Sequence, residues 1–135
     1  AAASIALSDH HSRTVPYIFN RKEANDHAEG GITVGAKLEG RVLIIDDVIS
    51  SGMSVDESVD IIKAAGATPA GVAISLDRQE RGKGEKSAAQ EVTSEFDIPV
   101  ISIAGLDDLI EFLERRSVAN IDIDAIRRYR KGYGV

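Results

Sequence analysis

Two adjacent carboxylates and several small hydroxyl residues follow one apolar run of the chain. Residues 41–45 read RVLII, Asp46 and Asp47 come next, and VISSGMS then runs to Ser54. Backbone N–H groups that open a helix attract phosphate, and Gly52 allows a close backbone approach. Carboxylates repel phosphate, so the two Asp residues are better suited to bind sugar hydroxyls or to approach a metal through water. The segment therefore predicts a sugar-phosphate site.

A purely structural role is the alternative explanation of this segment. Ser54 would then cap a helix and Gly52 would make a turn, as such residues usually do. This explanation leaves the paired carboxylates unexplained, because adjacent like charges after a buried strand repel one another and lose hydration. We therefore favour the binding site, with Ser50, Ser51 and Ser54 as further hydroxyl donors.

The elements that must position this segment alternate along the chain. Apolar runs predict strands at 16–19, 41–46, 70–76 and 100–103, with the strand at 41–46 buried on both faces. Helical spacing predicts helices at 1–11, 54–65, 85–96, 106–115 and 123–130. The apolar faces of the last two helices should contain Leu109, Ile110, Leu113, Ile126 and Tyr129. The alternation predicts one α/β domain over residues 1–135 with a central parallel sheet, and ligands bind such sheets beyond the carboxyl ends of the strands.

Two further regions lack the expected sequence signals: one has no apolar period, and the other has no signal for the beginning of a helix. Residues 21–40 lack a sustained apolar period, which predicts a mobile loop. The helix expected at residues 1–11 begins without a capping residue or a starting methionine, so we expect an N-terminal part of the fold to be missing.

Composition narrows the possible functions. The chain has 22 acidic and 16 basic residues and a net charge of −6, which argues against a broad nucleic-acid-binding face. It contains no cysteine, which excludes disulfides and thiolate metal sites. No apolar run is long enough to cross a membrane, and residues 1–7 do not resemble a signal peptide. We therefore expect a cytoplasmic protein.

Three segments together resemble one enzyme family. VLIIDDVISSGMS resembles the phosphoribosyl pyrophosphate (PRPP) motif of type I phosphoribosyltransferases, while RKEANDHAEGG and DRQERG are similar to segments that mark orotate phosphoribosyltransferases. The resemblance covers essentially the whole chain. It implies a Rossmann-like type I phosphoribosyltransferase fold with a mobile catalytic loop. It also implies Mg²⁺-dependent transfer of phosphoribose from PRPP to orotate, giving orotidine 5′-monophosphate and pyrophosphate in pyrimidine (UMP) biosynthesis.

The resemblance also implies roles for individual residues. Asp46 and Asp47 would hold the ribose hydroxyls, and Val48–Ser54 would wrap the 5-phosphate. A loop would close over pyrophosphate and reach into the partner subunit's site, which implies a homodimer with shared active sites. The residues expected to bind PRPP are Arg21, Lys22, Asn25, His27, Asp46, Asp47, Val48, Ile49, Ser50, Ser51, Gly52, Met53 and Ser54. Those expected to take part in catalysis are Arg21, Lys22, His27, Asp46 and Asp47.

Orotate and the metal have fewer implied contacts. Arg78 would bind the orotate carboxylate, for which a planar guanidinium is well suited, and Ser50 would also touch orotate. Without the resemblance, Arg78 and Arg81 would be expected to pair with Asp77 and Glu80 at the strand end. No protein group is expected to bind Mg²⁺ directly, because the substrate would hold the ion, with Asp46 and Asp47 contributing at most through water.

The sequence departs from the family pattern in the loop. Asn25 occupies the position at which the family's loop normally carries a lysine that is important for catalysis. A neutral donor such as Asn binds a developing pyrophosphate more weakly than a charged one. We expect slower turnover rather than lost binding. The family's N-terminal region, which contributes further orotate contacts and a Tyr-Lys pair near pyrophosphate, has no counterpart in the sequence.

Three other functions fit parts of the pattern. The first is a phosphoribosyltransferase that uses a purine or uracil, against which the segments RKEANDH and DRQERG argue. The second is a non-catalytic regulator that binds PRPP, which the Asn25 substitution keeps open. The third is a receiver-like domain with an acidic Mg²⁺ site, which does not require the Ser/Gly phosphate loop and ranks last.

Overall fold

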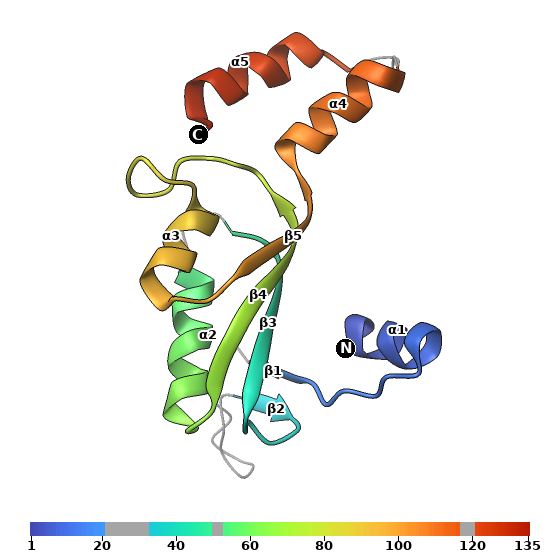
Figure 1. The fold of residues 1–135 in the computed structure, drawn as a ribbon, viewed down its shortest axis with the longest axis vertical. Coiled ribbons are helices and arrows are strands. Elements are labelled where there is room, and N and C mark those ends of the chain that lie inside the picture. Colours follow the sequence, from blue (N-terminus) through green and yellow to red (C-terminus); the bar gives the residue numbers. More distant parts are fainter. Residues whose placement is uncertain (21–32, 50–52, 117–120) are drawn as a thin grey trace. The chain divides into compact units, whose positions relative to one another are not determined.

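The structure is a computed structural model that describes residues 1–20, 33–49, 53–116 and 121–135. It divides into two compact units, residues 1–39 and residues 40–135. Figure 1 labels the helices and strands of both units.

The first unit contains one helix and a short antiparallel strand pair. Helix α1 spans Ala2–His11 and has no buried residue. Strands β1 (Ile18–Asn20) and β2 (Thr33–Gly35) pair with Phe19 opposite Val34. Gly35 has a φ of 124°, and a Cβ at this position would lie 2.4 Å from the Tyr17 carbonyl oxygen. Only glycine therefore fits the end of β2 without displacing the chain.

The second unit is built on a parallel three-stranded sheet in the order β3-β4-β5. Its strands span Arg41–Val48 (β3), Thr68–Asp77 (β4) and Val100–Gly105 (β5). The register places Ile44 beside Val72, and Val72 beside Val100. Because the strands are parallel, their carboxyl ends, which include Asp46 and Asp77, lie along one edge of the sheet.

Helices α2 (Met53–Ala64) and α3 (Ala88–Phe96) connect these strands and cover one face of the sheet (Figure 1). Val55 and Val59 of α2 and Val72 of β4 are fully buried, and they form the centre of the core. The spacing of the two valines thus holds α2 on the sheet.

Helix α3 begins with a capping box, in which the Ser87 and Gln90 side chains each accept a hydrogen bond from the other residue's backbone N–H.

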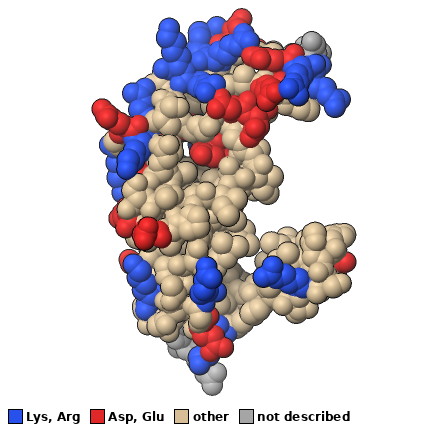
Figure 2. Space-filling model, in the orientation of Figure 1, with Lys and Arg blue, Asp and Glu red and all other residues tan. Residues whose placement is uncertain are grey.

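Helices α4 (Leu106–Arg116) and α5 (Ile123–Tyr133) follow β5 and pack on each other. Ile110 and Leu113 of α4 are buried, whereas α5 has no buried residue. Figure 2 shows side chains of both charges gathered over these two helices. Ion pairs such as Arg127 with Glu114 link them.

The α/β fold with a parallel sheet is confirmed, and each expected helix and strand has a counterpart close to its expected bounds. Two expectations were wrong. Strand β2 lies within the stretch expected to be a loop, where three residues are too few to show an apolar period. Strand β3 is not buried on both faces: Leu43 is 53% and Ile45 60% exposed, because α2 and α3 cover only the opposite face. Of the residues expected on the apolar faces of α4 and α5, Leu109 is 39% and Tyr129 40% exposed.

The prediction of one domain over residues 1–135 stays a prediction. Within the described ranges, no helix has the length and apolar character needed to cross a membrane.

Candidate functional site

The carboxylate pair lies at the carboxyl end of β3, as the sequence predicted. Asp46 is half-buried and Asp47 is exposed, while Val48 ends the strand and Ile49 is buried just beyond it. The next described residue, Met53, begins α2. The pair and the start of α2 therefore bracket the segment that was expected to bind phosphate.

Hydrogen bonds fix the two carboxylates in different ways. The Asp46 side chain accepts from the Ser54 hydroxyl through Oδ2 (3.1 Å) and from the Asp47 N–H through Oδ1 (2.9 Å). The Asp47 side chain accepts only from the Val48 N–H, through Oδ1 at 2.8 Å, among the bonds of the described residues. Asp46 is thus tied to the start of α2, whereas Asp47 presents an exposed carboxylate oxygen to solvent.

Ser54 joins the strand end to the helix. Its hydroxyl reaches back to Asp46, and its carbonyl oxygen accepts a bond from the Ser58 hydroxyl at 2.8 Å. A serine in the first turn of a helix commonly bonds the helix's own free N–H groups. The bond to Asp46 instead couples the helix start to the acidic pair, a connection that the simple capping explanation did not predict.

Several expected site residues fall outside the described ranges. These are Arg21, Lys22, Asn25, His27, Ser50, Ser51 and Gly52. Met53 is described only as the first residue of α2. The roles that the resemblance implies for these residues stay predictions.

Arg78 lies immediately after β4, at the same edge of the sheet as Asp46 and Asp47. Its Nε donates to Glu80 Oε1 at 2.8 Å and its Nη2 lies 2.7 Å from the same oxygen. The Nη2 atom also donates to the Tyr129 hydroxyl at 3.1 Å. The hydrogen bonds with Tyr129 and then Glu80 raise the pKa of the Arg78 guanidinium, which stays fully charged.

Arg78 and Arg81 were alternatively expected to pair with Asp77 and Glu80. Arg78 does pair with Glu80, but the Arg81 Nη2 atom donates to the Gly132 carbonyl oxygen at 2.7 Å. The Asp77 carboxylate instead accepts from the Gln79 N–H at 2.9 Å. The pairing of Arg78 does not exclude a ligand, since it uses only part of the guanidinium.

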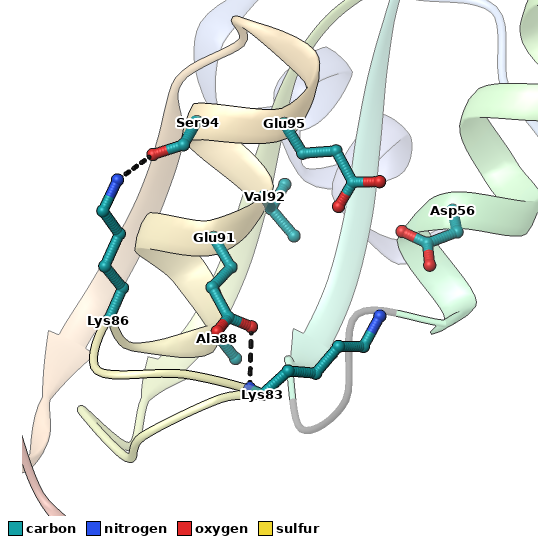
Figure 3. A pocket seen from close by; sticks show the side chains of 8 residues that line it. All are labelled: Asp56, Lys83, Lys86, Ala88, Glu91, Val92, Ser94 and Glu95. Atoms are coloured by element: carbon teal, nitrogen blue, oxygen red, sulfur yellow. Dashed lines mark hydrogen bonds between the residues drawn. The ribbon is translucent and has the colours of Figure 1, made fainter.

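A separate hollow of about 370 Å³ lies between α2 and α3. Figure 3 shows Lys83, Lys86 and Asp56 around it, and Glu91 accepting from the Lys83 N–H. None of the expected site residues that the structure describes lines this hollow. Charges of both signs line it, and Glu91 is already engaged with the loop backbone, so we assign this hollow no ligand.

No three His, Asp or Glu side chains of the described residues gather in a way that could hold a metal ion. At the carboxyl end of β3, the acidic groups near a possible metal are the Asp46 and Asp47 carboxylates. Mg²⁺ is commonly held by one or two carboxylates together with substrate phosphates and water. The pair fits such a shared role, with the exposed Asp47 the more accessible of the two.

Comparison with known sequences agrees with this arrangement. Residues 15–104 match the phosphoribosyl transferase domain family, a range that contains the acidic pair and Arg78. The chain belongs to the phosphoribosyltransferase domain family. The match includes all three sheet strands of the second unit except the last residue of β5.

Two relatives of this phosphoribosyltransferase domain are called orotate phosphoribosyltransferase. The protein of Thioalkalivibrio sulfidiphilus is 59% identical over 135 residues, which are all of this chain and 63% of the relative. The protein of Thiobacillus denitrificans is 61% identical over 123 residues, or 91% of this chain and 58% of the relative. The chain thus spans about three fifths of the length of these relatives.

Solved structures show the same fold. The orotate phosphoribosyltransferase of Francisella tularensis superposes with a TM-score of 0.80 and 34% identity, over 99% of this chain and 63% of that chain. The Mycobacterium tuberculosis enzyme in complex with PRPP gives a TM-score of 0.57 and 28% identity, over 72% of this chain and 51% of that one. The type I phosphoribosyltransferase fold is therefore confirmed.

Sequence reasoning missed the contribution of α5. Tyr129 was expected on an apolar face, yet its hydroxyl meets the Arg78 and Glu80 side chains. No local pattern could have shown this contact, because Tyr129 and Arg78 are 51 residues apart. The sequence offered one hint of this contact, namely a tyrosine placed among the charged residues of α5.

Proposed function

We propose that the protein containing this chain is an orotate phosphoribosyltransferase, which transfers the phosphoribosyl group of PRPP to orotate. The observation that carries the proposal is the placement of Asp46, Asp47 and Arg78 at one edge of the parallel sheet. Carboxylates there suit ribose hydroxyls, and a charged guanidinium suits the carboxylate of the base. The high identity to two proteins called orotate phosphoribosyltransferase supports this choice of base.

The chain's own groups would act mainly by positioning the reactants. Asp47 accepts one ribose hydroxyl through its exposed carboxylate, while Asp46, held by Ser54, accepts a second one. The 5-phosphate lies at the start of α2, where backbone N–H groups attract an anion. Arg78 orients orotate so that its N1 faces C1 of the ribose. Correct placement of two reactants removes much of the entropic part of a reaction barrier.

The remaining roles follow the family resemblance. Mg²⁺ bound with PRPP would neutralise pyrophosphate charge as the leaving group departs. Arg21, Lys22 and His27 would add donors to pyrophosphate from a closing loop, where stabilisation that grows in the transition state raises the rate. We also propose a cytoplasmic homodimer with shared active sites that contributes to UMP synthesis.

The test is release of pyrophosphate by the intact protein supplied with orotate, PRPP and Mg²⁺. We expect Asp46→Asn and Asp47→Asn to lower kcat/KM by on the order of 10- to 100-fold each, the effect of losing a hydrogen bond to a charged group. Asp60→Asn, which changes an exposed carboxylate of α2, serves as the matched control and should keep normal activity. A double variant as active as the unchanged protein would refute the sugar site.

Two further results would change the functional assignment. PRPP binding without pyrophosphate release with any base would identify a PRPP-binding regulator, the alternative that Asn25 keeps open. Release that depends on a purine or on uracil, and not on orotate, would identify a different phosphoribosyltransferase. The same assay with Asn25→Lys should show faster turnover with little change in PRPP affinity, since a charged donor binds pyrophosphate more strongly.

A further inference from the structure

One carboxylate oxygen accepts from two side chains that lie far apart in the sequence. Glu80 Oε1 accepts from Arg78 Nε at 2.8 Å, lies 2.7 Å from Arg78 Nη2, and accepts from the Tyr129 hydroxyl at 2.5 Å. The Tyr129 oxygen in turn accepts from Arg78 Nη2 at 3.1 Å. Arg78, Glu80 and Tyr129 therefore form a closed ring of hydrogen bonds, called the arginine clamp below.

The arginine clamp occupies a defined part of the guanidinium. Arginine has five N–H donors. The hydrogen bonds of the clamp use the donor on Nε, which bonds Glu80, and one donor on Nη2, which bonds Tyr129, while Nη2 also forms an ion pair with Glu80 Oε1. Among the described residues, Nη1 makes no hydrogen bond. Because the guanidinium is planar and rigid, fixing its Nε and Nη2 side also fixes the direction in which Nη1 points. The side chain is 41% exposed, so a ligand can reach it.

The clamp also changes the charge that a ligand would meet. The Glu80 side chain is 23% exposed and would repel an approaching carboxylate if its oxygens were free. Its Oε1 atom is instead covered by donors from Arg78 and Tyr129. An anion that approaches Nη1 thus meets a guanidinium of fixed direction beside a carboxylate that is already neutralised locally.

Backbone bonds hold Tyr129 where the clamp needs it. The Arg81 N–H donates to the Tyr133 carbonyl at 2.9 Å, and the Val135 N–H donates to the Gln79 carbonyl at 3.0 Å. Arg130 of α5 also forms an ion pair with Asp107 of α4. The C-terminal helix is therefore attached directly to the loop that follows Arg78. This attachment fixes the backbone that carries Tyr129 close to Arg78.

We propose that Tyr129 and Glu80 are positioning residues that aim Arg78 at the carboxylate of the base. The inference rests on the proposed function, in which Arg78 binds orotate. It predicts that α5 contributes to recognition of the base and not to recognition of PRPP, whose expected contacts lie within residues 21–27 and 46–54.

Steady-state kinetics of the intact protein test this inference. Tyr129→Phe keeps the ring and removes only the hydroxyl, and we expect it to raise the KM for orotate by about three- to tenfold, as for one lost hydrogen bond. The KM for PRPP should stay unchanged. Tyr133→Phe is the matched control, because Tyr133 packs against Tyr129 with ring centroids 4.8 Å apart and its hydroxyl makes no hydrogen bond to the described residues. It should leave both KM values unchanged.

A double-mutant cycle separates positioning from general stability. In an Arg78→Ala background, adding Tyr129→Phe should raise the KM for orotate no further, since its effect acts through Arg78. Glu80→Gln provides a second variant and should also raise the KM for orotate without changing that for PRPP.

Each outcome decides something. If the unchanged protein uses orotate but Tyr129→Phe and Glu80→Gln leave its KM unchanged, or raise both KM values equally, the positioning role is overturned while the proposed function stands. Additive effects of Arg78→Ala and Tyr129→Phe would also overturn it. If the unchanged protein neither binds nor uses orotate, both proposals fail.

Discussion

The capping box at the start of α3 offers a sharp test of how the second unit is stabilised. The Ser87 hydroxyl accepts from the Gln90 N–H at 3.1 Å, and the Gln90 side chain accepts from the Ser87 N–H at 3.0 Å. Ser87 is only 3% exposed, so water cannot readily replace the lost acceptor in Ser87→Ala. The Gln90 N–H would then lack a partner close to the core.

We expect Ser87→Ala to lower the free energy of unfolding by about 1–2 kcal/mol, the upper part of the range for N-cap serine. Ser87→Gly should cost only a few tenths of a kcal/mol, because glycine is a tolerated N-cap residue. Ser58→Ala is the control: its hydroxyl bonds the Ser54 carbonyl within α2, and its loss should change stability by less than about 0.5 kcal/mol.

Urea unfolding followed by far-UV circular dichroism measures these differences. The urea midpoint should fall for Ser87→Ala at a constant m-value, since the substitution leaves the surface exposed on unfolding almost unchanged. A midpoint for Ser87→Ala equal to that of Ser58→Ala would refute the reasoning. So would a Ser87→Gly variant that loses as much stability as Ser87→Ala.

Three further predictions concern charge, core packing and backbone conformation. The Lys83 N–H bond lowers the pKa of Glu91, so its contribution is present at neutral pH and is lost as the pH falls through this lowered pKa. Urea midpoints of the unchanged protein and Glu91→Gln should therefore converge on acidification, and a constant difference would contradict this. Val59→Ala, at a fully buried position, should lower the free energy of unfolding by about 2–3 kcal/mol, and a loss below about 0.5 kcal/mol in urea unfolding would argue against tight packing. Gly35→Ala should displace β2, because its Cβ would lie 2.4 Å from a backbone oxygen, and hydrogen exchange at the Ala36 amide should become faster. Unchanged exchange would show that the strand pair adapts.

Much of the second unit could be predicted from sequence because its apolar pattern is strong. Residues 41–45 and 70–76 formed strands, and the spacing of Val55 and Val59 predicted the buried side of α2. The exposed face of the sheet could not be predicted, since an apolar run indicates burial without saying which helices provide it. Strand β4 also begins earlier than expected, as Thr68 and Pro69 pair with the first residues of β3.

The site was predictable where its residues adjoin one another in sequence. Asp46 and Asp47 follow an apolar run directly, so their place at the strand end followed from the fold class. The bond from Ser54 to Asp46 and the clamp on Arg78 depend on side-chain directions and on long-range packing. Residue types alone cannot fix such directions, which is why the role of Tyr129 became visible only in the structure.

The attachment of α5 also divides the protein molecules into two populations, one with α5 attached and one with α5 locally open. Helix α5 has no buried residue, and segments with little buried apolar surface open locally at low free-energy cost. Each opening would release Tyr129 and leave Glu80 as the remaining clamp partner of the Arg78 guanidinium. If Arg78 binds the base as proposed, the apparent affinity for the base would then scale with the fraction of molecules in which α5 is attached. Solvent conditions that loosen this helix should therefore weaken base binding well before the sheet unfolds.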